Sequence, residues 1–111
     1  MKTINVDVAI IGAGSAGLNA RREAEKAGKS WVLIDGGPLG TTCARVGCMP
    51  SKALIAAASA AEDVRRAPRF GVACPVPEVD GRAVMARVNA LRDRFVSHLL
   101  ERVEELPGHM R

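Results

Sequence analysis

Cys43, Cys48 and Lys52 are the residues of this sequence whose types and spacing best suit redox chemistry. A separation of five residues turns two side chains by roughly 140° in a regular helix, so a disulfide between the cysteines needs a distorted turn, which Gly47 permits. A strained, accessible disulfide at a helix start is readily reduced, and the helix dipole lowers the pKa of a thiol there. Lys52 lies one helical turn after Cys48 and adds a positive charge. The alternative is a pair of reduced thiols buried as small hydrophobes.

A glycine-rich turn precedes this segment and has the spacing of a nucleotide-binding loop. Gly12, Gly14 and Gly17 follow a β-branched run at 5–11 and precede a polar, Ala-rich stretch. In such a strand–turn–helix unit the first glycine allows the tight turn and the second lets a pyrophosphate approach the backbone. The third lets the helix and strand pack closely. The pattern favours a cofactor that contains ADP, and the alternative is a set of glycines that serve a plain turn.

The residues beside this loop supply the other expected contacts to the cofactor. Ser15 and Ala16 begin the helix, whose N-terminus offers N–H donors and a positive partial charge to the pyrophosphate. Asp35 and Gly36 follow the second apolar run, and the Asp35 carboxylate is expected to accept hydrogen bonds from the two ribose hydroxyls of an adenosine. We therefore take these four residues as candidate cofactor-binding residues.

The elements that must position these groups follow from the local patterns and make an α/β fold. A stripe of apolar residues spaced three or four apart near the end of the chain predicts a helix about seven turns long, closed by Pro107 and Gly108. Pro50 suits the first turn of a helix. We expect strands at 5–11 and 31–34, a helix from the glycine loop to Ala27, a loop or distorted helix start at 38–49, a helix at 51–67, an extended connection at 69–80 and the long helix at 84–106.

Composition narrows the class of protein. The 111 residues are 48% hydrophobic and 25% charged, which is typical of one globular domain or part of one. No apolar run fits a signal peptide or a membrane span, so we expect a cytoplasmic protein that does not bind membranes. The charge of +4 is spread over both halves and aromatic residues are 3%, which argues against nucleic-acid binding. A metal site is also not expected, because the histidines lie far from the cysteine pair.

The segment 40–52, with the sequence GTTCARVGCMPSK, closely resembles the redox-active site of the class I pyridine nucleotide-disulfide oxidoreductases. These are FAD flavoenzymes that include dihydrolipoamide dehydrogenase, glutathione reductase and mercuric reductase. The resemblance extends to the glycine fingerprint, the acidic residue after the second strand and the long helix, so it covers essentially the whole chain. It implies the N-terminal part of a Rossmann-like FAD-binding domain: a βαβ unit, a redox-active helix and a long amphipathic helix.

The resemblance also implies how the cofactor is held. Gly12, Gly14 and Gly17 would face the FAD pyrophosphate. Asp35 would contact the adenosine ribose, and Thr42 would contact the phosphate region of the same cofactor. NAD(P) would bind outside this segment.

The catalytic roles that the resemblance implies fall on three residues. Cys48 would be the thiol nearest the flavin, able to form a charge-transfer contact, and Cys43 would be the thiol that exchanges with substrate. Lys52 would lie near the N5 edge of the flavin and tune its reduction. Electrons would pass between NAD(P)H, flavin, the Cys43–Cys48 disulfide and a small-molecule or protein-bound dithiol or disulfide.

The sequence departs from the usual family pattern at a few positions. Thr41 replaces a common glycine, Ala44 and Arg45 replace a usual Leu-Asn pair, and Asp35 is shorter by one methylene than the frequent Glu. Both cysteines and Lys52 are retained, so the redox centre is expected to be intact. The Ala44–Arg45–Val46 segment and the length of the last helix look most like those of bacterial dihydrolipoamide dehydrogenase-type members.

Members of the family are several times longer than this chain, so we expect residues 1–111 to be a portion of an FAD-binding domain. The NAD(P) domain and the dimerisation domain, which makes the homodimer, would lie elsewhere. His98 and His109 match no motif of the family's acid/base pair, and Cys74 is expected to be a small buried or boundary hydrophobe. Two short strands also need neighbours to make a stable sheet. The competing hypothesis is a free-standing nucleotide-binding module whose thiol pair is a redox switch without hydride transfer.

Overall fold

The computed structural model describes residues 3–110. Of the expected domain portion at 1–111, residues 1, 2 and 111 lie outside the described residues. The chain divides into two compact units, Met1–Thr42 with Val96–Arg111, and Cys43–Phe95. The elements in chain order are β1 (Val8–Ile11), α1 (Ser15–Lys26), β2 (Trp31–Ile34), α2 (Thr42–Arg45), α3 (Cys48–Arg66), the 3-10 helix η1 (Ala67–Phe70), α4 (Gly81–Glu104) and β3 (His109–Met110). The α/β fold expected from the sequence is confirmed.

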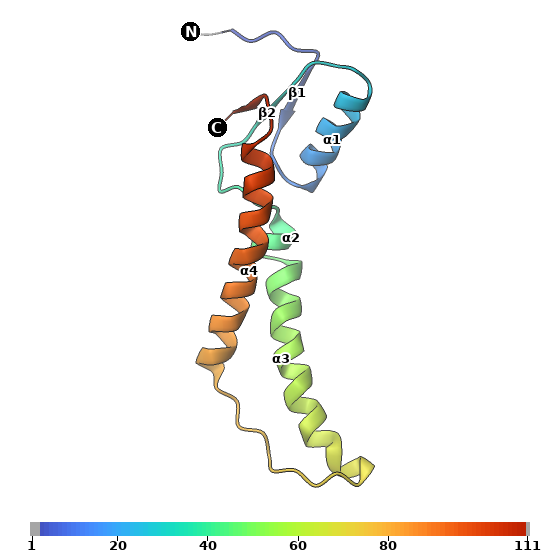
Figure 1. Ribbon diagram of the computed structural model, residues 1–111, viewed down its shortest axis with the longest axis vertical. Helices are drawn as coiled ribbons and strands as arrows, with labels where there is room; N and C mark the ends of the chain where they lie inside the picture. The colour runs from blue at the N-terminus through green and yellow to red at the C-terminus, as the bar shows by residue number, and fades with distance from the viewer. Residues whose placement is uncertain (1–2, 111) are drawn as a thin grey trace. The chain divides into compact units, whose positions relative to one another are not determined.

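The first unit is built on a parallel βαβ arrangement. β1 pairs with β2 in register from Val8 opposite Trp31 to Ile11 opposite Ile34. The helix α1, which connects the two strands, lies beside them (Figure 1). The strand order in the sheet is β1-β2-β3, and β3 also runs parallel to β2. The sequence did not predict β3, because two residues are too few to show a periodic pattern.

The core of this unit is small and lies around β2. Leu33 is fully buried, and Ile10, Ala13, Leu39 and Val103 pack in the same cluster. By contrast, the side chain of Ile11 at the end of β1 is 87% exposed. The end of this outer strand therefore presents an apolar side chain that the core of the unit does not cover.

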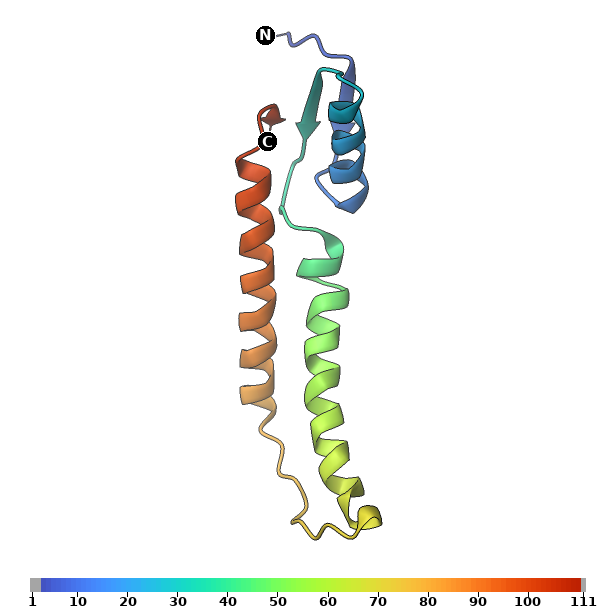
Figure 2. The same ribbon diagram turned by 45° about the vertical axis from the view of Figure 1, so that its right-hand side comes forward.

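The second unit is a pair of helices. α3 and the part of α4 that ends at Phe95 lie side by side and are joined by η1 and an extended segment (Figures 1 and 2). α3 begins at Cys48, three residues before the expected start, and Pro50 falls in its first turn as expected. The connection is extended only after Gly71, because Ala67–Phe70 form the 3-10 turn η1.

α4 begins and ends earlier than its apolar stripe predicted. The carboxylate of Asp80 accepts hydrogen bonds from the backbone N–H groups of Arg82 at 2.9 Å and Ala83 at 3.0 Å. It therefore caps the helix and sets its start at Gly81 instead of residue 84. Similarly, the first strand begins at Val8 instead of residue 5, since pairing starts where Trp31 provides a partner. No helix within the described residues combines the length and the apolar character that crossing a membrane requires.

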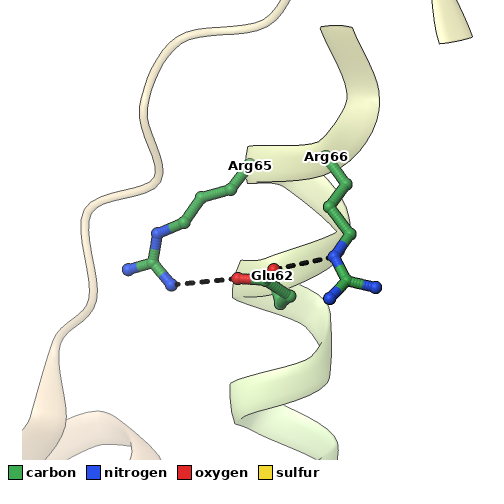
Figure 3. Close-up of polar contacts among 3 residues, drawn as sticks. All are labelled: Glu62, Arg65 and Arg66. Carbon is green, nitrogen blue, oxygen red and sulfur yellow. Dashed lines mark hydrogen bonds and ion pairs between the residues drawn. The ribbon is translucent and has the colours of Figure 1, made fainter. Parts of the chain in front are cut away.

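The end of α3 is stabilised by charge. Glu62 lies between two arginines and pairs with Arg66 Nε at 2.7 Å and with an Arg65 guanidinium nitrogen at 3.7 Å (Figure 3). The arginines occupy the last turn, where their positive charge also interacts favourably with the negative end of the helix dipole. All three side chains are substantially exposed, so each pair contributes only about 0.5 kcal/mol.

Candidate functional site

The glycine-rich loop continues directly from the sheet. The backbone N–H of Gly12 donates to the Ile34 carbonyl at 2.7 Å, which extends the strand pairing by one residue. Gly12 then turns the chain with φ of +98°, a conformation that L side chains rarely adopt. A Cβ added to Gly17 would lie 1.8 Å from the Gly12 carbonyl oxygen. The close packing expected at Gly17 is therefore confirmed, and only glycine fits at this position.

The start of α1 presents backbone donors to the space around the loop. Within the part of the chain that the structure describes, no side chain caps the helix at Gly14, and its first turn holds no acidic residue. Ser15 and Ala16 are exposed. A Cβ added to Gly12 or Gly14 would meet no atom within 4 Å. The loop thus has open space beside a helix N-terminus. A bound pyrophosphate needs this space, together with the backbone N–H donors and the positive partial charge of the helix N-terminus.

Asp35 lies next to this loop and makes two short hydrogen bonds to backbone groups. One carboxylate oxygen, Oδ2, accepts the Ala13 N–H at 2.5 Å, and the other, Oδ1, accepts the Gly37 N–H at 2.6 Å. The neighbouring Gly36 is exposed, and an added Cβ there would meet nothing within 4 Å. The sequence predicted a ribose contact for Asp35 and missed its two backbone partners. The parallel register could have suggested the first, since the residues that follow Ile11 and Ile34 must be neighbours.

A second carboxylate joins the opposite ends of the same two strands. Asp7 accepts the Ser30 backbone N–H at 2.8 Å and the Ser30 hydroxyl at 2.7 Å, and its own N–H donates to Ser30 Oγ at 2.9 Å. These hydrogen bonds from Ser30 hold the pKa of Asp7 below its ordinary value of 3.8, and desolvation opposes them only weakly. This contact was not predicted from the sequence either.

The two cysteines of the pair stand on either side of a break between helices. Cys43 belongs to α2, and Cys48 is the first residue of α3. Gly47 separates the helices with φ of −121° and ψ of −112°, outside the helical region. The Ser51 hydroxyl donates to the Gly47 carbonyl at 2.8 Å and holds the first turn of α3 in place. The distorted turn predicted between the cysteines is therefore confirmed.

Both cysteines are exposed free thiols, and the thiol of Cys43 interacts with Cys48. The pKa of Cys43 is raised above its ordinary value of 9.0, mainly because its thiol is hydrogen-bonded to Cys48. Desolvation and the charge of Cys48 raise it further, whereas the Cys48 backbone N–H and the positive charge of Lys52 lower it. For Cys43 the general expectation of a lowered thiol pKa is wrong, because the partner thiol outweighs the nearby positive charge.

Lys52 also lines a cavity of about 230 Å³ in the second unit. The cavity lies between α3 and α4, and its wall combines two cations, Lys52 and Arg92, with apolar side chains. Arg92 pairs with Asp93 at 2.7 Å. The remaining lining residues are Met49, Ala53, Leu91 and Phe95.

Other polar residues singled out from the sequence lie apart from these groups. Cys74 is partly buried and its thiol donates to the Val64 carbonyl at 3.1 Å, so the expected boundary position is confirmed. His98 is exposed and lies 3.7 Å from the Glu101 carboxylate. No three His, Cys, Asp or Glu side chains among the described residues are grouped so that they could hold a metal ion.

The candidate residues therefore form two groups, one in each unit. The glycines, Ser15, Ala16, Asp35, Gly36 and Thr42 belong to the first unit, and Thr42 is exposed at the start of α2. Cys43, Cys48 and Lys52 belong to the second. The first group can bind an anionic nucleotide through backbone donors, and the second can undergo thiol–disulfide chemistry.

Comparison with known proteins gives a consistent result. A family model described as pyridine nucleotide-disulphide oxidoreductase matches residues 6–109. A mercuric reductase of Streptomyces lividans is 41% identical over 86 residues, which cover 77% of this chain and 18% of the relative. A dihydrolipoyl dehydrogenase of Bacillus subtilis is 33% identical over 99 residues, which cover 89% and 21%.

A glutathione reductase of Yarrowia lipolytica is 34% identical over 93 residues, which cover 84% of this chain and 20% of the relative. The chain thus spans about a fifth of the length of the curated relatives that it matches. The three relatives have different substrates in their names, so similarity over this region does not separate them.

Proposed function

Because the chain belongs to the pyridine nucleotide-disulphide oxidoreductase family, we propose that it is the N-terminal portion of the FAD-binding domain of a disulfide oxidoreductase. Members of this family use FAD and NAD(P). The observation that carries the proposal is the pair of interacting thiols, Cys43 and Cys48, on either side of a glycine-containing helix break and one turn before Lys52.

The cofactor-binding role falls on the first unit. The open backbone at Gly12 and Gly14 and the uncapped start of α1 at Ser15 and Ala16 suit the pyrophosphate of FAD. Asp35 and Gly36 would face the adenosine ribose, and Thr42 would contact the phosphate region. When bound, FAD supplies the transfer of two electrons between NAD(P)H and the thiol pair.

The thiol pair performs the exchange with substrate. The thiolate of Cys43 attacks one sulfur of a substrate disulfide, so that a mixed disulfide forms and the first substrate thiolate leaves. The thiolate of Cys48 then attacks Cys43, which forms the Cys43–Cys48 disulfide and releases the second substrate thiolate. Two electrons have passed from the protein dithiol to the substrate, and the leaving thiolates take up protons. Lys52 stabilises the thiolate of Cys43 during these steps. The reverse sequence oxidises a dithiol substrate.

Within this class we propose dihydrolipoamide as the substrate and a homodimer as the working form. The support is the resemblance of the Ala44–Arg45–Val46 segment and of the long helix to bacterial dihydrolipoamide dehydrogenase-type members, together with the similarity to the Bacillus subtilis dihydrolipoyl dehydrogenase. Mercuric ion and glutathione disulfide are the competing substrates, since the relatives named for them also match most of the chain, 77% and 84% of it.

The first test is the visible absorbance spectrum of the protein expressed from its entire reading frame. We expect flavin bands, and a long-wavelength band that develops when a dithiol is added and is lost in Cys48→Ser. Cys74→Ser is the matched control, because Cys74 lies outside the pair and should leave the band unchanged.

Turnover with dihydrolipoamide and NAD⁺, glutathione disulfide and NADPH, or mercuric ion and NADPH then identifies the substrate. A protein that contains no flavin, but whose thiols still form a reversible disulfide, would overturn the oxidoreductase proposal and favour the thiol-switch module. Faster turnover with either competing substrate would overturn the choice of dihydrolipoamide alone.

A further inference from the structure

We propose that Asp35 is a positioning residue that holds the glycine-rich loop in its pyrophosphate-binding shape. The inference rests on the proposed nucleotide-binding function and adds a second role to the expected ribose contact. The inference follows from two hydrogen bonds that the carboxylate accepts from backbone N–H groups. One N–H group lies in the loop and the other in the turn after β2.

The carboxylate of Asp35 is itself held in one orientation. Its Oδ1 accepts the N–H of Gly37, two residues later, which makes a side-chain turn that is typical of Asp. Gly37 has φ of +70°, so the turn uses a conformation in which glycine is favoured. Leu39, two residues beyond, is buried in the core cluster and anchors the segment. The local chain therefore fixes the direction of Oδ2.

Oδ2 then fixes the middle of the glycine-rich loop. It accepts the N–H of Ala13 at 2.5 Å. The Ala13 side chain is 3% exposed and packs in the same core as Ile10 and Leu33. With its N–H bonded and its methyl group buried, Ala13 is constrained on both sides. Gly12 and Gly14 flank it, and these are the positions where open space adjoins the backbone.

A carboxylate at this position has two opposite effects on anion binding: it holds the loop, and its negative charge repels the ligand. Hydrogen bonds from backbone N–H groups to an ionised carboxylate are about twice as strong as those to a neutral acceptor. Yet a negative charge beside a pyrophosphate site repels the ligand. The two effects predict opposite changes in anion affinity when the charge is removed, which makes the proposal testable with a probe that has no ribose.

The test measures binding of inorganic pyrophosphate and of ADP, by calorimetry, to nucleotide-free protein from the entire reading frame. In Asp35→Asn one acceptor oxygen faces two N–H donors, so at least one of the two hydrogen bonds is lost. We expect pyrophosphate to bind about tenfold more weakly although a negative charge has been removed. Asp35→Glu keeps the charge but displaces it by one methylene, and we expect it to weaken pyrophosphate binding as well.

Asp7→Asn is the matched control, because Asp7 also accepts two hydrogen bonds and joins the same two strands at their other ends. It should leave pyrophosphate affinity unchanged. Hydrogen exchange of the Ala13 amide in nucleotide-free protein gives a second measurement, and exchange should become faster in both Asp35 variants and not in Asp7→Asn.

Three other outcomes would overturn the inference. Unchanged or tighter pyrophosphate binding in Asp35→Asn, with weaker ADP binding, would show a ribose contact only and overturn the positioning role while nucleotide binding stands. If the wild-type protein bound neither probe, the nucleotide-binding function and this inference would both fail. A variant that did not fold while Asp35→Glu bound pyrophosphate normally would also overturn the inference.

Discussion

The glycine-rich loop and the thiol segment both interrupt regular structure to expose chemical groups, but they use different atoms. In the loop the useful groups are backbone N–H donors, and what matters is the absence of side chains at Gly12, Gly14 and Gly17. In the thiol segment the useful groups are the side chains of Cys43 and Cys48, which a helix break brings together. The loop should therefore be sensitive to added atoms, and the thiol segment to the removal of a functional group.

The largest expected effect comes from adding one methyl group to the loop. In Gly17→Ala the new Cβ would lie 1.8 Å from the Gly12 carbonyl oxygen, so α1 must move away from β1. We expect a loss of about 3 kcal/mol in the free energy of unfolding, with a parallel loss of nucleotide binding. Urea unfolding of the protein from its entire reading frame measures the first, and calorimetry with ADP measures the second.

Gly28→Ala is the control, because this glycine lies just beyond the C-terminus of α1, at the opposite end of the strands from the glycine-rich loop. Its φ is +66°, and an added Cβ there would meet no atom within 4 Å. We expect a cost of about 1 kcal/mol from backbone conformation alone, with ADP binding unchanged. Equal losses in both variants would mean that the loop is not especially sensitive to added atoms, and the contrast between the two regions would break.

Much of this contrast was predictable from the sequence, because both regions depend on local patterns. The glycine spacing after a β-branched run predicted the close packing at Gly17. The separation of Cys43 from Cys48, with Gly47 between them, predicted a break in the helix. The second strand at 31–34 was predicted at its observed bounds. In each case the pattern that carried the prediction lies within a short stretch of consecutive residues.

The contacts that sequence analysis missed join residues far apart in the chain. Asp35 bonds Ala13, and Asp7 bonds Ser30, across separations of 22 and 23 residues. A carboxylate at a strand end is visible in the sequence, but its partner depends on strand register. The raised pKa of Cys43 was missed for a related reason, since it depends on which partner contributes most. Distance and direction decided these points, and residue type alone does not supply them.

The thiol segment gives the second test, in which a group is removed. In Cys48→Ala the hydrogen-bonding and charged partner of Cys43 is lost, so the pKa of Cys43 should fall back toward its ordinary 9.0. More Cys43 thiolate is then present at mildly alkaline pH, and alkylation of Cys43 by iodoacetamide should be faster than in the reduced wild-type protein. Mass spectrometry of the Cys43 peptide follows this cysteine separately from Cys74.

Lys52→Gln should move the same rate in the opposite direction. Its positive charge lowers the pKa of Cys43, so its removal raises that pKa and slows alkylation. The change should be smaller than in Cys48→Ala, because the Lys52 charge is the weakest of the contributions at Cys43. If alkylation were slower in Cys48→Ala, the partner thiol would not be what holds the proton on Cys43, and the thiol pair would not act as a unit.

The smallest expected effect concerns Asp7, which lies outside both regions. A variant at Asp7 tests whether the glycine-rich loop and the thiol segment respond to any change in the fold or only to changes within themselves. Hydrogen bonds from Ser30 lower the pKa of Asp7 in the folded protein, so its contribution to stability is present above 3.8, the unfolded value, and is lost as pH falls through the lower folded value. Thermal unfolding of wild-type protein and Asp7→Asn should therefore show a small difference in midpoint at neutral pH that shrinks as pH falls below 3.8. The rate of Cys43 alkylation and the affinity for ADP should be the same in both proteins. A difference in midpoint that persisted unchanged into strong acid would show that the Asp7 charge is not what joins the strands, and a change in ADP affinity would show that the loop responds to any loosening of the β1–β2 pair.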